Sequence, residues 1–129
     1  TPDGCPAVSP KATTIVLDST HLAFIDLRSP KTKRNIKANP FVELNYIDVF
    51  RRQACRIKGK ATYIERDDKK FDGMLKNFTA WSSLFEKAKG VFVVEILNAQ
   101  KILSPAYDNG ADEELLKAEW LAKYNTQLS

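Results

Sequence analysis

Apolar and β-branched side chains in the first half of the chain predict a series of strands. Residues 5–17 (CPAVSPKATTIVL) have no helical periodicity and predict a strand with an irregularity at Pro10. A turn at residues 18–20 leads into a second strand at residues 21–26 (HLAFID), so these two strands should be antiparallel. Further strands are expected at residues 41–48 and at about 52–65, where alternation places Arg56, Lys58 and Lys60 on a polar face.

Helical periodicity appears only in the second half of the chain. Residues 69–88 repeat apolar side chains at three- and four-residue steps and predict an amphipathic helix that packs on a sheet. A strand buried on both faces is expected at residues 91–97, a loop at 104–110 and a second helix at 113–124. Short antiparallel strands with late helices indicate one α+β domain over residues 1–129, built on a small barrel or strongly curled sheet.

Composition excludes several classes of protein. The chain is 43% hydrophobic and 28% charged, which is typical of a globular domain and indicates neither disorder nor a membrane span. Two cysteines form no disulfide framework, so we expect a reducing, cytoplasmic setting. His21 is the only histidine and no metal-ligand spacing surrounds it, so no metal site is expected.

The net charge of +4 is concentrated in one region. Residues 28–60 contain ten of the twenty Lys and Arg residues but only two acids, Glu43 and Asp48. The rest of the chain has ten basic and fourteen acidic residues. The basic region therefore predicts an anion site or a nucleic-acid surface.

A short basic helix lies inside this region. Ser29 is a preferred N-cap, Pro30 suits the first helical position, and Asn39-Pro40 ends the helix after about Ala38. The first N–H groups of a helix have no partner within it, so those of Lys31, Thr32 and Lys33 are expected to face an anion. A phosphate monoester fits this pattern, in a nucleotide, a flavin, a sugar phosphate or a nucleic-acid backbone. The simpler alternative is a solvated connecting helix.

The order of these segments resembles one known family. Residues 6–65, including NPFVELNY and the Gly59 of IKGKA, and the tail at residues 91–120 are similar to pyridoxamine 5'-phosphate oxidase-like flavoproteins. The resemblance implies an FMN-binding split barrel that forms a homodimer, with FMN in clefts between the subunits. It also implies an oxidoreductase with an unassigned substrate or electron donor, in which no catalytic side chain is identified.

The resemblance implies a set of cofactor-binding positions. Residues 11–13 align with the strand that lines the flavin ring, and Asp26 falls where the family has a threonine. Lys31 and Thr32 fall on two basic phosphate ligands, and Arg28 or Arg34 would compensate for the uncharged Thr32. Gln53 takes the place of a family glutamine after a one-residue shift, and Arg51 would reach the partner's flavin. The expected cofactor-binding set is Lys11, Ala12, Thr13, Asp26, Arg28, Ser29, Lys31, Thr32, Arg51 and Gln53.

Two departures from the family restrict these expectations. The tail lacks the Arg and His of true pyridoxamine 5'-phosphate oxidases, so vitamin B6 oxidation is not expected. The helix and first strand that usually precede such a segment are expected to be missing. Two alternatives stay open: a deazaflavin (F420)-dependent reductase whose longer cofactor meets the cations of residues 51–60, and a non-enzymatic barrel that binds nucleic acid. In the second alternative, bases would stack on Phe24, Phe41, Tyr46 and Tyr63.

Overall fold

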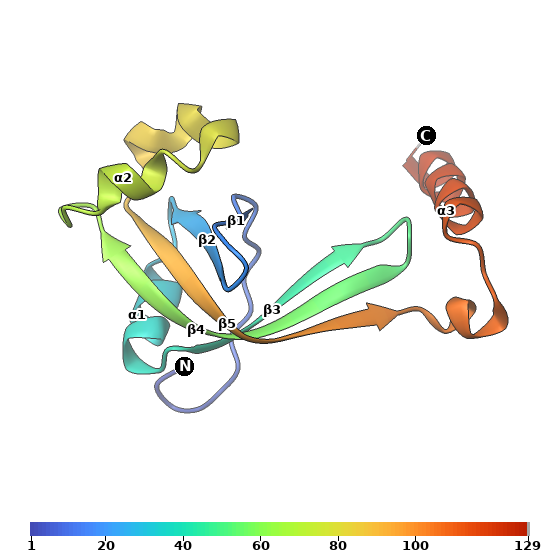
Figure 1. Cartoon of the computed structure of the whole chain (residues 1–129), viewed down its shortest axis with the longest axis horizontal. Helices are drawn as coiled ribbons and strands as arrows, with labels where there is room; N and C mark the ends of the chain where they lie inside the picture. The colour runs from blue at the N-terminus through green and yellow to red at the C-terminus, as the bar shows by residue number, and fades with distance from the viewer. Residues whose placement is uncertain (129) are drawn as a thin grey trace. The chain divides into compact units, whose positions relative to one another are not determined.

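The computed structural model describes residues 1–128 of the chain and contains five strands and three α-helices (Figure 1). The strands are β1 (Ile15–Val16), β2 (His21–Asp26), β3 (Phe41–Asp48), β4 (Gln53–Glu65) and β5 (Gly90–Leu103). The α-helices are α1 (Pro30–Ala38), α2 (Phe71–Leu75) and α3 (Glu113–Leu128), with two 3-10 segments, η1 (Thr79–Lys87) and η2 (Pro105–Asn109). None of the helices in this part of the chain has the length and apolar character needed to cross a membrane.

The five strands form one sheet in the order β1-β2-β5-β4-β3. β2 lies antiparallel to both β1 and β5, and its register with β5 places Phe24 opposite Phe92 and Asp26 opposite Gly90. This antiparallel sheet with separate helices confirms the predicted α+β class. The chain divides into two compact units, one comprising Thr1–Val42 and Lys58–Leu97 and the other Glu43–Ile57 and Asn98–Ser129.

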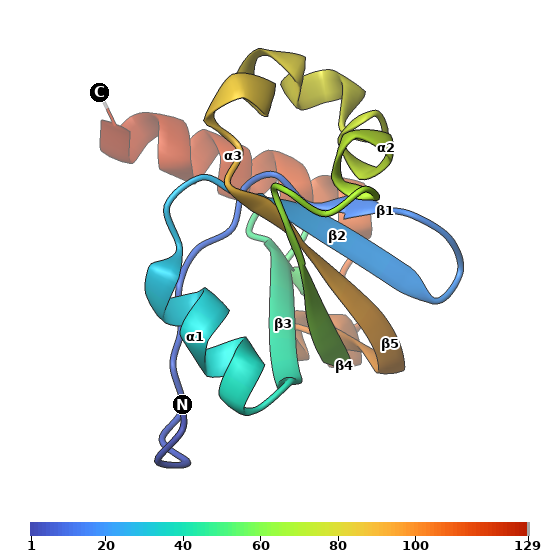
Figure 2. The same cartoon turned by 90° about the vertical axis from the view of Figure 1, so that its left-hand side faces the viewer.

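The first unit packs side chains on both faces of its sheet because successive strand residues point in opposite directions. Ala23 and Ile25 of β2 and Val91 of β5 join a buried cluster with residues of α2 and η1. On the other face, the ring of Phe92 stacks on Phe24 and meets Tyr63 edge-on. Figures 1 and 2 show α2 and α1 on opposite sides of this sheet.

The predicted first strand is wrong over most of its length. Only Ile15–Val16 is a strand, although the expectation covered residues 5–17. Proline has no backbone N–H to donate to a sheet ladder, and Pro6 and Pro10 interrupt this segment. Its residues from Cys5 to Pro10 are exposed, and Val8, the β-branched residue among them, is 99% exposed and has no core to pack against.

The continuous helix expected at residues 69–88 is also wrong. The segment breaks into α2 and η1, and Phe78 between them and Trp81 inside η1 have non-helical backbone angles. Asn77 helps to end α2 because its side-chain amide donates to the carbonyl of Met74, at 3.0 Å. The apolar spacing nevertheless identified core residues correctly, since Phe71, Leu75 and Phe78 are buried.

The expected strand and helix in the C-terminal part of the chain are present, but both are longer than predicted. β5 continues to Leu103, and only its beginning is buried, since Leu97 is 55% exposed. The expected loop at 104–110 contains the short segment η2. α3 continues to Leu128, four residues beyond its predicted end at 124.

The second unit holds α3 against the β3–β4 turn by aromatic and charged contacts. Arg52, whose φ of 57° lies in the left-handed region, places its guanidinium 4.1 Å from the ring centroid of Trp120. Phe50 meets Tyr124 edge-on with ring centroids 5.7 Å apart. The expected apolar side of α3 is therefore correct for Trp120 and Tyr124, whereas Leu115 is 68% exposed.

Asp18, in the turn between β1 and β2, is expected to contribute to stability in a pH-dependent way. The carboxylate of Asp18 accepts hydrogen bonds from the Thr20 N–H and hydroxyl, and it contacts Nδ1 of His21. These bonds, chiefly that of the Thr20 N–H, lower the pKa of Asp18 from 3.8 to about 2. A carboxylate with a depressed pKa stabilises the fold above its unfolded pKa, and this contribution disappears as the pH falls through about 2.

We therefore expect Asp18→Asn to lower the melting temperature at pH 7. The difference from the parent protein should shrink between pH 4 and pH 2 as the carboxylate becomes protonated (about the range of its two pKa values). Calorimetry across this pH range checks the prediction, with Asp67→Asn on an exposed turn as the control. A difference that stays constant with pH would contradict it.

Candidate anion-binding site at the start of α1

The start of α1 is held by a buried carboxylate rather than by its own N-cap side chain. Ser29 occupies the predicted N-cap position, but its hydroxyl makes no capping hydrogen bond. Instead, the Ser29 N–H donates to Oδ1 of Asp26 at 2.7 Å, and Asp26 is only 3% exposed. Asp26 ends β2, so the end of this strand directly fixes the beginning of the helix.

A lysine from the N-terminal segment reaches the same turn. Nζ of Lys11 donates to Oγ of Ser29 at 2.9 Å and to Oγ1 of Thr32 at 3.4 Å. Burial lowers the pKa of Lys11, and the charge of Asp26 acts in the opposite direction. The structure thus brings together four of the expected residues, Lys11, Asp26, Ser29 and Thr32, around one helix start.

Two further expected cations flank this turn. The side chains of Arg28 and Lys31 are exposed, and within residues 1–128 neither has a hydrogen bond or an ion pair. A cation at a helix N-terminus opposes the helix dipole unless an anion joins it. Both side chains are consequently available to a bound anion.

The expectation for the first three N–H groups needs one correction. The N–H of Lys33 donates to the carbonyl of Ser29 at 2.9 Å, as the first regular bond of the helix. Its ammonium is also engaged, since Lys33 and Lys37 each contact the carboxylate of Glu65 at 2.6 Å. The available donors are therefore the N–H groups of Lys31 and Thr32 and the hydroxyl of Thr32.

Ala12 and Thr13, which precede β1, have different surroundings. Ala12 is exposed. Thr13 is 7% exposed, and its hydroxyl accepts a hydrogen bond from the Ile25 N–H at 3.0 Å. The Thr13 hydroxyl therefore holds the N-terminal segment against β2, and its expected role toward a cofactor stays a prediction.

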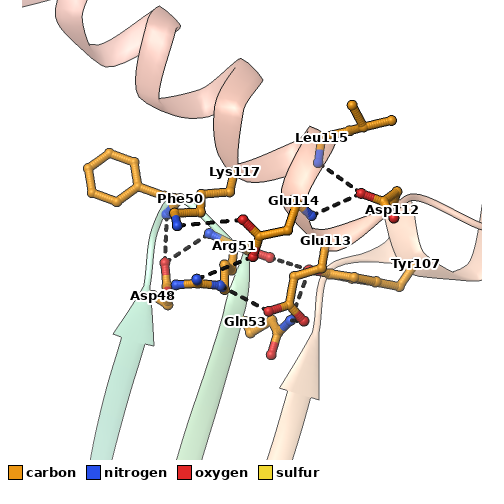
Figure 3. Close-up of polar contacts among 10 residues, drawn as sticks. All are labelled: Asp48, Phe50, Arg51, Gln53, Tyr107, Asp112, Glu113, Glu114, Leu115 and Lys117. Atoms are coloured by element: carbon orange, nitrogen blue, oxygen red, sulfur yellow. Dashed lines mark hydrogen bonds and ion pairs between the residues drawn. The ribbon is translucent and has the colours of Figure 1, made fainter.

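Arg51 and Gln53 belong to the second compact unit, where other residues of that unit engage them (Figure 3). The guanidinium of Arg51 pairs with Asp48 at 3.1 Å, Glu113 at 2.9 Å and Glu114 at 3.4 Å. Nε2 of Gln53 donates to the hydroxyl of Tyr107 and to Glu113. Their expected role toward a cofactor stays a prediction, and in this chain they tie the β3–β4 turn to α3.

The aromatic residues expected for base stacking are partly engaged in the core. Phe24 is 3% exposed and stacks on Phe92, with ring centroids 4.8 Å apart. The ring of Tyr63 also contacts the ring of Phe92, with centroids 4.7 Å apart. Phe41, in contrast, is 66% exposed. Phe24 cannot offer its face to a nucleic-acid base without leaving the core, which weakens the stacking hypothesis.

One residue of this site was not predicted from the sequence. The hydroxyl of Tyr63 in β4 donates to Oδ2 of Asp26 at 2.8 Å. Strand alternation places Tyr63 on the inner side of β4, but a separation of 37 residues carries no local signal of this bond. Among residues 1–128, no three His, Cys, Asp or Glu side chains are grouped as a metal site would require.

A family model and one solved structure indicate the same family. The family model of pyridoxamine 5'-phosphate oxidase matches residues 1–104. A candidate pyridoxamine 5'-phosphate oxidase from Lactobacillus delbrueckii is 30% identical, with a TM-score of 0.64 over 76% of this chain and 75% of its own. HupZ from group A Streptococcus has a TM-score of 0.66 over 79% of this chain and 78% of its own. At 18% identity, HupZ supports the fold alone. No curated protein is significantly similar to the chain.

Proposed function

We propose that this chain, which belongs to the pyridoxamine 5'-phosphate oxidase-like family, binds FMN with its phosphate at the start of α1. The family includes flavin-binding oxidoreductases. The observation that carries the proposal is the set of donors at one helix start: Lys11 at the Ser29 and Thr32 hydroxyls, with Arg28 and Lys31 beside them and without a side-chain partner among residues 1–128. Helix N-termini with adjacent cations favour dianionic phosphate groups.

The charges of the site fit a phosphate group. The carboxylate of Asp26 would repel an anion, but it is turned inward and accepts bonds from Tyr63 and Ser29. Lys11 lies close enough to Asp26 for their opposite charges to interact. Arg28 and Lys31 supply positive charge in addition to this pair, and the N–H groups of Lys31 and Thr32 supply directional donors.

The proposed activity is oxidoreduction, in which FMN supplies hydride or electron transfer when bound. The part played by this chain is to hold the phosphate end, while the backbone of residues 11–13 lies along the ring. We propose a homodimer as the functional unit, with the cofactor at the subunit interface and with Arg51 and Gln53 near the partner's flavin. The substrate is a small molecule or electron donor. Both cysteines are free thiols, which fits the proposed cytoplasmic setting.

Cofactor retention tests this proposal. The purified protein is mixed with FMN, with F420 or with buffer, then desalted, and the absorbance spectrum and the mass in solution are measured. We expect about one FMN per chain and the mass of a dimer. Retention of F420 alone would replace the cofactor by the deazaflavin of the alternative reductase. Retention of neither cofactor by a folded protein would overturn the proposal.

Lys31→Ala should weaken FMN binding by about 1.5 to 3 kcal/mol, the range for a hydrogen bond to a charged group. This corresponds to a roughly tenfold to 150-fold higher Kd, measured by quenching of flavin fluorescence. Lys76→Ala, at the C-terminal end of α2, removes the same charge elsewhere and should leave the Kd unchanged. Equal Kd values for Lys31→Ala and the parent protein would move the phosphate site away from α1.

A further inference from the structure

Tyr63 reaches from one strand across a second to a third. β5 lies between β4 and β2 in the sheet, and Gly90 of β5 is the register partner of Asp26 in β2. A Cβ at position 90 would meet the phenol of Tyr63 and would lie 2.7 Å from the carbonyl oxygen of Ile64. The absence of a side chain at Gly90 therefore provides the space through which the Tyr63 hydroxyl reaches Asp26.

The Asp26 carboxylate joins Tyr63 to the start of α1. Its Oδ2 accepts the Tyr63 hydroxyl at 2.8 Å, and its Oδ1 accepts the Ser29 N–H at 2.7 Å. Because the carboxylate is buried, each bond restricts its rotation, and a lost partner is not replaced freely by bulk water. The orientation of the first turn of α1 thus depends on where the phenol holds this carboxylate.

β4, the strand that carries Tyr63, also contacts α1 at Lys33. Nζ of Lys33 lies 4.6 Å from the centroid of the Tyr63 ring, and it also contacts Glu65 of β4. Burial and the hydrogen bond to Asp26 raise the pKa of Tyr63, so the phenol keeps its proton and remains a donor at neutral pH. β4 therefore contacts α1 through a permanent hydrogen-bond donor as well as through an ion pair.

We propose that Tyr63 is a positioning residue for the anion site: through Asp26 and Ser29 it aims the free N–H groups of Lys31 and Thr32 at the phosphate. This inference rests on the proposed function, because the phosphate is that of FMN. Tyr63 itself need not touch the cofactor. The expected consequence is an effect on binding of the phosphate end without a comparable effect on binding of the flavin ring.

Tyr63→Phe tests this proposal because it removes the hydroxyl and keeps the ring. The Kd values for FMN and for riboflavin, which lacks the phosphate, are measured for the parent protein, for Tyr63→Phe and for Tyr124→Phe. Tyr124→Phe is the matched control in the second unit. We expect Tyr63→Phe to weaken FMN binding about tenfold, the equivalent of about 1.4 kcal/mol, and to change riboflavin binding less than twofold.

Amide hydrogen exchange at Ser29 gives a second measurement without cofactor. We expect faster exchange of the Ser29 N–H in Tyr63→Phe than in the parent protein, while Tyr124→Phe leaves it unchanged. Unchanged FMN binding, or equal losses for FMN and riboflavin, would overturn the positioning role and leave the FMN proposal intact. Failure of the parent protein to bind FMN would instead overturn both proposals. Circular dichroism verifies that each variant is folded before binding is measured.

Discussion

Phe92→Ala is expected to lower the free energy of unfolding by about 3 to 5 kcal/mol, the usual cost of truncating a buried phenylalanine. Phe92 is fully buried in β5. Its ring stacks on that of Phe24 in β2 and meets that of Tyr63 in β4, with ring centroids 4.8 Å and 4.7 Å apart. The substitution removes apolar area from the core and leaves a cavity between three neighbouring strands. Backbone atoms of a central strand cannot move far enough to fill this cavity.

Chemical denaturation followed by circular dichroism measures this effect. Phe41→Ala provides the matched control, because the same atoms are removed from a side chain that is 66% exposed. The control should change the free energy of unfolding by about 0.5 kcal/mol or less. Both variants are compared at one protein concentration, since association would stabilise the folded state by mass action. Equal effects of the two substitutions would contradict the central place of Phe92 in the core.

Gly90→Ala is expected to destabilise the protein by about 3 kcal/mol, near the upper end of the range for overpacking. The added methyl group would meet the Tyr63 phenol, which could rotate away, and the Ile64 carbonyl oxygen, which is part of β4 and cannot. Displacement of Tyr63 would also break its bond to Asp26. Thermal and chemical unfolding measure the loss of stability, and flavin fluorescence measures the loss of FMN affinity that the proposed function leads us to expect.

Gly73→Ala is the control for this substitution. Gly73 lies in α2, and apart from its chain neighbours and the backbone of its own helix no atom lies within 4 Å of the added methyl group. Alanine is favoured over glycine inside a helix, so this change should stabilise the protein by up to about 1 kcal/mol. A neutral Gly90→Ala variant would show that β4 and β5 lie farther apart than the structure has them.

The helix α1 was predicted from the sequence with correct boundaries at Pro30 and Ala38. Proline at the first helical position and the Asn39-Pro40 stop act on the backbone of adjacent residues, so their effect does not depend on distant contacts. The alternating pattern of β4 was equally informative, because its exposed Lys58 and Lys60 are solvated whichever strands lie beside them.

The segment at residues 69–88 shows what an apolar pattern predicts and what it does not. Its apolar spacing identified the buried residues Phe71, Leu75 and Phe78, but the helix joining them breaks after Leu75. A bent chain can bury the same side chains as a continuous helix, and burial outweighs the small differences in helix propensity. Periodicity therefore reported which residues face the core and not the path of the backbone between them.

The candidate site likewise has a part that the sequence predicted and a part that only the tertiary structure revealed. Lys31, Thr32 and Lys33 are neighbours in the first turn of α1, so local rules were sufficient to group their N–H groups as candidate anion donors, of which that of Lys33 is engaged by Ser29. The buried bond between Tyr63 and Asp26 depends on the strand order β2-β5-β4 and on the pairing of Asp26 with Gly90. Strand order and register follow from the packing of the whole sheet, because hydrogen-bonded neighbours are chosen by long-range contacts. Short-range capping signals thus located the proposed phosphate donors, whereas tertiary packing brings the phenol of Tyr63 to the carboxylate of Asp26 beside them.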